Sequence, residues 1–159
     1  MPALKVREAE LDAVTDAVLL SSRALVAVAS RSIAAVDESV TLPQFRALVV
    51  LDRADAGLNV GELAHELRIQ PSTATRLCDR LVRRRLARRR VNRGNRREVN
   101  MMLTAAGRDL VAEVTRRRRR EIASIMAKVP AAQRTAIIDA LTAFREAAGE
   151  DDVVPPVPW

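Results

Sequence analysis

Cysteine, aromatic residues and glycine are scarce in this sequence. Its 159 residues include one cysteine, no tyrosine, one tryptophan, two phenylalanines and five glycines. A single cysteine excludes a disulfide within the chain and is typical of a reducing compartment, so we expect a cytoplasmic protein. Hydrophobic residues make up 48 % of the chain and aromatic residues only 2 %. The core must therefore be built from Leu, Val, Ile and Ala, a composition that favours helices.

Long apolar segments are also lacking. The first eleven residues are charged and contain no apolar stretch of the kind that a signal peptide has. No stretch approaches about 18 uninterrupted apolar residues, so we expect no transmembrane span. The sequence offers no nucleophile–base pair, no glycine-rich phosphate loop and no catalytic carboxylate cluster. We therefore expect neither an enzyme nor a bound cofactor.

Positive charge is concentrated in one segment. The formal net charge of the chain is +7, but residues 68–100 contain twelve arginines against two acids. This segment therefore has an excess of ten positive charges, and the remainder of the chain has a net charge of −3. A local basic patch of this kind indicates a polyanionic partner.

Hydrophobic periodicity predicts a mainly helical chain with a small β-hairpin. Thr41 is the expected N-cap of the second helix, and Gly94-Asn95 is the expected turn of the hairpin. In the final helix we expect Ile137, Ile138, Leu141 and Phe144 to be buried. The predicted helices are 7–36, 42–54, 61–67, 71–84, 104–129 and 130–147, and the predicted strands are 58–60, 87–92 and 98–103.

This order of elements predicts a winged helix-turn-helix domain at 42–103. The flanking segments, 1–36 and 104–150, have apolar stripes that are too long for so small a core. We therefore expect them to be dimerisation helices that intertwine with a second copy of the chain. The tail, 151–159, is acidic and then proline-rich, and we expect it to be irregular.

The helix that begins at Pro71 has two contrasting faces. Ala74, Leu77, Cys78 and Leu81 follow helical spacing and should face the core. Short hydroxyl groups can approach base edges or phosphates, arginine can bind guanine through two hydrogen bonds, and a helix N-terminus favours phosphate. The helix is therefore a candidate reader of the DNA major groove, with a merely solvated face as the alternative. The outward residues are Ser72, Thr73, Thr75, Arg76, Asp79, Arg80 and Arg83.

The predicted hairpin carries a second group of arginines. As a purely structural hairpin it would repel itself, whereas an arginine-bearing tip beside Gly94 can enter a minor groove, where the potential attracts guanidinium. We therefore interpret the hairpin as a DNA-binding wing. Its arginines are Arg88, Arg89, Arg90, Arg93, Arg96 and Arg97.

Five short motifs together resemble the MarR family of winged-helix regulators over about residues 42–110. The resemblance implies a homodimer, usually a transcriptional repressor, that binds pseudo-palindromic double-stranded DNA through recognition helices and wings. The motifs are LPQF at 42–45, VGELA at 60–64, TRLCDRL at 75–81, NRR at 95–97 and LTAAG at 103–107. The expected DNA-binding residues are Ser72, Thr73, Thr75, Arg76, Arg80, Arg90, Arg93, Asn95, Arg96 and Arg97.

The wing region departs from the family pattern at three positions, one of which is Ala87, where the family usually has Val. Asn95 stands where the family usually has Asp, so it can hydrogen-bond Arg97 but cannot neutralise it. Arg85 stands where the family usually has Gly, so we expect either a left-handed backbone there or a changed turn.

Family members often bind a small phenolic or carboxylate compound between the first two helices and the long fifth helix. By position, the resemblance makes Ser22, Arg23, Arg31 and Phe45 the candidate effector-binding residues. An arginine could bind the carboxylate of such a ligand. We therefore expect a repressor that a small aromatic or carboxylate ligand releases from DNA, with a non-specific nucleic-acid-binding or architectural protein as the alternative.

Three further features have simpler interpretations. Cys78 faces the predicted core, so we interpret it as a packing residue and not as a redox switch. His65 lies near Glu62 and Glu66, but a single histidine without a nearby cysteine does not predict a metal site. The run 116–120 contains five arginines, and we expect a solvated face partly paired with Glu113 and Glu121.

Overall fold

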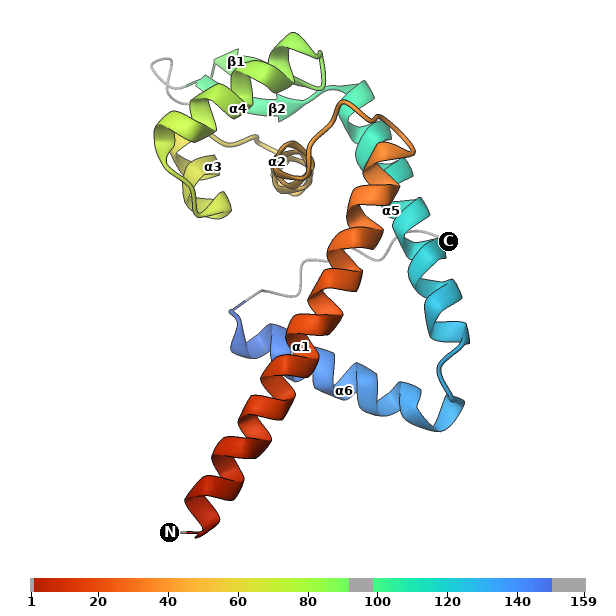
Figure 1. Ribbon diagram of the computed structural model, residues 1–159. Coiled ribbons are helices and arrows are strands. Elements are labelled where there is room, and N and C mark those ends of the chain that lie inside the picture. The colour runs from red at the N-terminus through yellow and green to blue at the C-terminus, as the bar shows by residue number, and fades with distance from the viewer. Residues whose placement is uncertain (1, 92–98, 150–159) are drawn as a thin grey trace.

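Helices make up most of the computed structural model, which describes residues 2–91 and 99–149 (Figure 1). Within these residues the chain forms six helices and one antiparallel two-stranded sheet, which confirms the predicted fold class. The elements are α1 (Pro2–Ala34), α2 (Leu42–Asp52), α3 (Val60–Leu67), α4 (Pro71–Arg83), β1 (Ala87–Val91), β2 (Val99–Leu103), α5 (Ala105–Ala127) and α6 (Ala131–Ala147).

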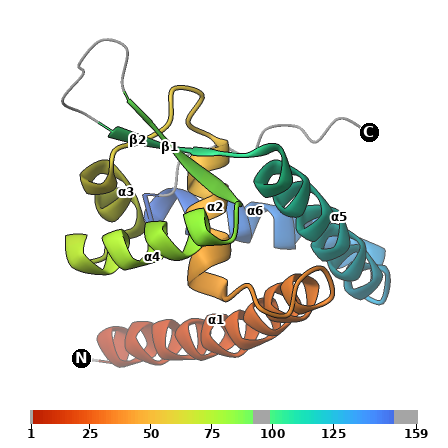
Figure 2. The same cartoon turned by 90° about the horizontal axis from the view of Figure 1, so that it is seen from above.

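Helix α2 lies at the centre of a body that also contains α3, α4 and the hairpin (Figure 2). Helices α1 and α5 pack against each other next to this body and extend away from it toward α6 (Figure 1). The body core contains buried residues of α2, α3, α4 and β2, and it also includes Ile33 of α1 and Leu110, Val111 and Val114 of α5. The two long helices are therefore anchored in the body at the ends nearest to it.

Side-chain caps fix where the helices of the body begin. Thr41 caps α2 in a capping box with Gln44, as predicted, and Asn59 caps α3 in a second box with Glu62. Because Asn59 is a cap, α3 begins at Val60, and the strand predicted at 58–60 is reduced to the single bridge between Leu58 and Met101.

The start of α5 is bonded to the turn between α4 and β1. The Thr104 hydroxyl donates to the carbonyl oxygens of Arg85 at 2.7 Å and Leu86 at 3.1 Å, and it accepts the Gly107 amide at 3.1 Å. A Cβ atom on Gly107 would lie 2.1 Å from the Leu86 carbonyl oxygen, so only glycine allows this approach. The motif at 103–107 thus joins α5 to the base of the hairpin.

Arg85 adopts the left-handed conformation with φ of 58°, which confirms one of the two alternatives expected at this position. Its amide donates to the Val82 carbonyl at 2.9 Å, and its carbonyl accepts the Thr104 hydroxyl. These two bonds hold a residue that carries a Cβ in a backbone region that glycine prefers.

The apolar faces of α1 and α6 remain exposed in the single chain. Leu11 of α1 is 66 % exposed, and Ile138, Leu141 and Phe144 of α6 are each more than half exposed. The prediction that these α6 residues are buried is therefore wrong for the isolated chain, since no residue of α6 is buried. Large apolar side chains exposed in this number are typical of an interface.

One helix is long and apolar enough to cross a membrane by length and composition. The segment Glu8–Ala34 has a mean hydropathy of 1.5, whereas the sequence-based expectation of no span considered only uninterrupted apolar runs. The criterion is weak because core helices of soluble proteins also meet it. Here Val28 and Ile33, at the end of this segment, are buried in the protein, but only 11 % of its apolar window is buried in the single chain.

Candidate nucleic-acid interface

Helix α4 presents the two faces that its sequence predicts. Ala74, Leu77, Cys78 and Leu81 are buried against the body, which confirms the predicted inward face. The predicted DNA-binding side chains of the helix are all exposed: Ser72, Thr73, Thr75, Arg76 and Arg80. The structure therefore brings them together on one surface.

The first turn of α4 has no side-chain cap. Its N-cap, Gln70, makes no side-chain cap hydrogen bond, and Pro71 occupies the first turn. The Thr75 hydroxyl donates to the Pro71 carbonyl at 3.0 Å, and Arg76 Nε donates to the Ser72 carbonyl at 3.3 Å. Pro71 has no N–H, and the Thr73 amide donates to the Gln70 carbonyl at 2.9 Å, so among the first three residues of the helix Ser72 is left to offer its amide to a phosphate. The positive end of the helix dipole and the hydroxyl and guanidinium groups lie beside it.

The described part of the hairpin places further arginines next to α4. Strand β1 pairs with β2 so that Arg90 lies opposite Asn100. The side chain of Asn100 donates to the Ala56 carbonyl at 3.2 Å, which fixes the hairpin to the turn before α3. Arg90 is exposed, as expected for a wing residue. The predicted contacts Arg93, Asn95, Arg96 and Arg97 lie outside the described residues.

Among the described residues of the basic patch, two arginines form ion pairs within the chain that no sequence pattern predicts. Arg89 of β1 pairs with Asp79 of α4, and Arg84 pairs with Asp37 in the segment between α1 and α2. Ten residues separate the first pair and 47 separate the second. No sequence pattern marks either contact. Within residues 2–91 and 99–149, Arg76 and Arg80 have no carboxylate partner and so can bind an external anion.

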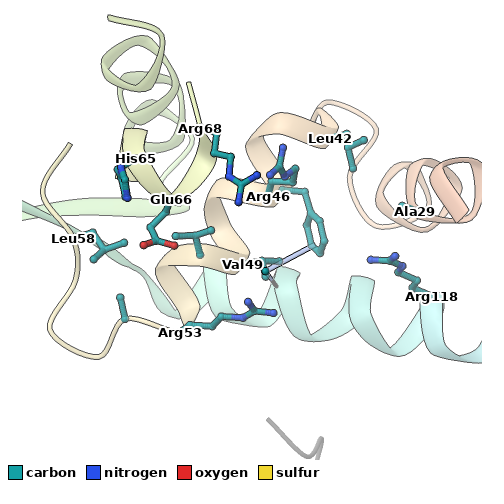
Figure 3. Close-up of a pocket in the computed structure, with 14 residues that line it drawn as sticks. Ala29, Leu42, Arg46, Val49, Arg53, Leu58, His65, Glu66, Arg68 and Arg118 are labelled. Atoms are coloured by element: carbon teal, nitrogen blue, oxygen red, sulfur yellow. The ribbon is translucent and has the colours of Figure 1, made fainter. Parts of the chain in front are cut away.

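A groove of about 760 Å³ lies between α2, α3 and α5 (Figure 3). Arginine predominates among its charged residues, which are Arg46, Arg53, Arg68 and Arg118 against a single acid, Glu66. Phe45 lines this groove, whereas the other predicted effector residues, Ser22, Arg23 and Arg31, do not. No sequence pattern marks these four arginines as a group, because they come from three separate helices or from the residues that cap them.

Those other candidates have different surroundings. The Ser22 hydroxyl donates to the Leu19 carbonyl at 2.7 Å on exposed α1, where Arg23 is also exposed. Arg31 pairs with Glu121 of α5. Arg31 therefore joins the two long helices in this structure and is not directed into the groove.

The structure also bears on the cysteine, the arginine run and the question of a metal site. Cys78 is fully buried, and this burial raises the pKa of its thiol above the ordinary value of 9.0, as expected for a packing residue. Arg116 and Arg117 pair with Glu113 at 2.7 and 2.9 Å, and the hydrogen bond from Arg116 is the main cause of the lowered pKa of Glu113. The predicted pairing of the arginine run with Glu113 is confirmed, whereas Glu121 pairs with Arg31 of α1. No cluster of potential metal ligands is found in the part of the chain that the structure describes.

A helix with one buried and one exposed face, placed after a tight turn and followed by a hairpin, defines the winged helix-turn-helix class of DNA-binding proteins. The sequence model of the MarR family matches residues 39–98. The crystal structure of RV1404 from Mycobacterium tuberculosis matches with a TM-score of 0.83 and 47 % identity, over 90 % of this chain and 97 % of that one. The chain belongs to the MarR family: it is a DNA-binding transcriptional regulator and not an enzyme.

Other solved structures share the fold. A MarR family protein from Bacillus stearothermophilus is 26 % identical with a TM-score of 0.71, over 94 % of this chain and 99 % of that one. MepR, a transcription regulator from Staphylococcus aureus, is 21 % identical with a TM-score of 0.71, over 84 % and 97 % of the two chains. No curated protein sequence matches the chain.

Proposed function

We propose that this protein is a dimeric, sequence-specific repressor in the cytoplasm that binds a pseudo-palindromic operator. The observation that carries this proposal is the exposed face of α4, where hydroxyl and arginine side chains surround an uncapped helix N-terminus. Such a face can contact base edges in the major groove while the helix dipole holds a phosphate.

Each group of residues has a proposed role. Ser72, Thr73 and Thr75 approach base edges or phosphates, and Arg76 and Arg80 supply base or phosphate contacts. Arg90 and the remaining wing residues, Arg93, Asn95, Arg96 and Arg97, bind the flanking minor groove. A mutant of the relative MepR has been solved bound to an oligodeoxyribonucleotide, which supports DNA as the partner of this fold.

A second copy of the chain is the proposed partner of α1, α5 and α6. The exposed apolar residues of α1 and α6 supply a surface that an isolated chain leaves in water. We therefore retain residues 42–103 as the DNA-binding unit, 1–36 and 104–150 as the dimerisation helices, and 151–159 as the tail. In a dimer with two-fold symmetry the two α4 helices would read related half-sites.

The proposed effector is a small carboxylate that occupies the groove between α2, α3 and α5. Four arginines against one acid favour an anion, and Phe45 with Val49 and Val50 supplies an apolar wall for an aromatic ring (Figure 3). MepR has been solved with ethidium bromide, which supports a small-molecule site in this fold. The organic part of ethidium bromide is a cation, so the ligand proposed here has the opposite charge.

Fluorescence anisotropy with a duplex from the upstream region of the protein's own gene tests DNA recognition. We expect tighter binding than to a scrambled duplex, with a strong dependence on salt. Arg76→Ala should relax preference at one base position, whereas Arg97→Ala should weaken binding to all sequences and lower the salt slope by about one. Equal affinity for both duplexes would support the alternative, a non-specific architectural protein, and overturn the specific one.

Benzoate tests the effector in the same assay, with uncharged benzamide as the matched control. Benzoate should release the operator and benzamide should not. Arg53→Ala should reduce the effect of benzoate because it removes one groove cation. Release by neither compound, or by both alike, would contradict a carboxylate site while leaving DNA binding intact.

A further inference from the structure

Among the arginines of the basic patch that the structure describes, Arg84 is the one whose guanidinium group bonds to two residues of another segment. It is the C-cap of α4, and its side chain reaches the segment between α1 and α2. Nη1 donates to the Ser39 carbonyl at 2.6 Å, Nη2 donates to Asp37 Oδ2 at 2.6 Å, and Nη2 also contacts the Ser39 hydroxyl.

The acceptors of Arg84 are themselves held in place. The Ser39 amide and hydroxyl both donate to Asp37 Oδ1, at 3.0 and 2.6 Å. The side chains of Arg84 and Asp37 are only 26 % and 32 % exposed, and Arg84 is less exposed than the arginines of the other ion pairs found among the described residues. Three residues therefore form one closed network of charged hydrogen bonds.

The network lies between the scaffold of long helices and the recognition helix. Asp37 follows closely on the end of α1, where Val28 and Ile33 are buried and Arg31 pairs with Glu121 of α5. The other end of the network is the last turn of α4. The α1–α5 pair and α4 are thus joined by polar contacts over a distance of 47 residues in sequence.

We propose that Arg84 is a positioning residue for DNA recognition and not a phosphate ligand. By holding Asp37 and Ser39 it fixes the orientation of α4 relative to α1 and α5. The orientation matters because a dimer must insert two α4 helices into the DNA at once, so an error in each helix affects both half-sites. This inference rests on the proposed reading of an operator by α4.

The substitution Asp37→Asn distinguishes a positioning role from a purely electrostatic one, because the two predict opposite changes in the affinity for DNA. The substitution removes a negative charge near the basic patch and frees Arg84, so a purely electrostatic account predicts tighter binding to any DNA. If Arg84 positions α4, the same substitution loosens the network and weakens operator binding. The substituted side chain has the same shape, which leaves the packing around it unchanged.

The test compares the full-length protein with Asp37→Asn, Arg84→Gln, the double variant and Arg83→Gln by anisotropy on operator and scrambled duplexes. Arg83 is the matched control, since it is the exposed neighbour of Arg84 with the same charge. We expect Asp37→Asn and Arg84→Gln each to lose about tenfold in operator affinity and in preference over scrambled DNA. The double variant should lose no more than either single one, and Arg83→Gln should keep the preference.

Operator binding by Asp37→Asn that equals or exceeds that of the unchanged protein would overturn the inference. Losses that are the same for Arg83→Gln and Arg84→Gln would overturn it as well. Thermal unfolding followed by circular dichroism checks that each variant is folded at the assay temperature. If Arg84→Gln is unfolded there, the operator affinity of Asp37→Asn alone tests the positioning role. Lack of operator preference in the unchanged protein would overturn the proposed function, and this inference with it.

Discussion

Glycine at position 85 should stabilise the protein, because Arg85 has the left-handed conformation with φ of 58°. Its amide and carbonyl are both hydrogen-bonded, to the Val82 carbonyl and the Thr104 hydroxyl, so the backbone cannot relax without losing a bond. The informative comparison is Arg85→Gly against Arg85→Ala. Both remove the exposed side chain and its charge, and only the first removes the Cβ.

The expected difference follows from two opposing effects. Left-handed backbone costs a residue with a Cβ about 1–2 kcal/mol. Glycine loses more chain entropy on folding, which costs about 0.5–1 kcal/mol. The free energy of unfolding of the Arg85→Gly variant should therefore be about 0.5–1 kcal/mol higher than that of the Arg85→Ala variant. For a chain of this size that is a rise of roughly 2 °C in melting temperature.

Urea denaturation at one fixed protein concentration measures the difference, since a dimer's stability depends on concentration. Arg80 supplies the control, because it is exposed within α4. There glycine should be less stable than alanine by about 1 kcal/mol, the opposite sign. If Arg85→Gly is no more stable than Arg85→Ala, left-handed strain at this turn is refuted.

Three further predictions concern the core, the thiol and the acid range. Gly107→Ala should destabilise by about 2 kcal/mol or more in urea denaturation, since the added Cβ would lie 2.1 Å from the Leu86 carbonyl oxygen, whereas Ala106→Ser at the exposed neighbour should change stability little. Iodoacetamide at about pH 8 should label Cys78 only in denaturant, because the thiol is buried and its pKa is raised; rapid labelling of the native protein would contradict this. Hydrogen bonds from Ser39, and then from Arg84, lower the pKa of Asp37 below 3.8 in the folded state. The stability difference between the unchanged protein and Asp37→Asn should therefore be constant above about pH 5 and vanish as the pH falls through the lowered pKa; a difference that grows on acidification would have the wrong sign.

Local patterns predicted much of the fold because short-range physics fixes it. Neighbouring residues determine the Thr41 cap of α2 and the end of α4 before β1. They also determine which residues of α4 face inward, namely those at 74, 77, 78 and 81. The wrong prediction of a strand at 58–60 also has a local cause. These three residues suit a strand, but Asn59 caps α3 together with Glu62, three residues further on, and so the helix begins at Val60. The error in α6 is different, because an apolar stripe predicts that something covers it but not that the cover lies in the same chain.

The candidate DNA surface was largely predictable, whereas the electrostatics within it were not. Ser72, Arg76 and Arg80 share a helix face by spacing alone. The pairs Arg84–Asp37 and Arg89–Asp79, and the four arginines of the groove, depend on contacts between separate elements. Counting charges therefore overstated how many arginines of the patch are free to bind DNA.

The sequence by itself determined where helix α4 begins and which of its faces points outward. These properties depend on residues within one or two turns of each other. Only the tertiary structure decided which arginines form ion pairs within the chain and which line a groove. A guanidinium group acquires its role from the carboxylate or carbonyl that it meets, and that partner can lie 47 residues away.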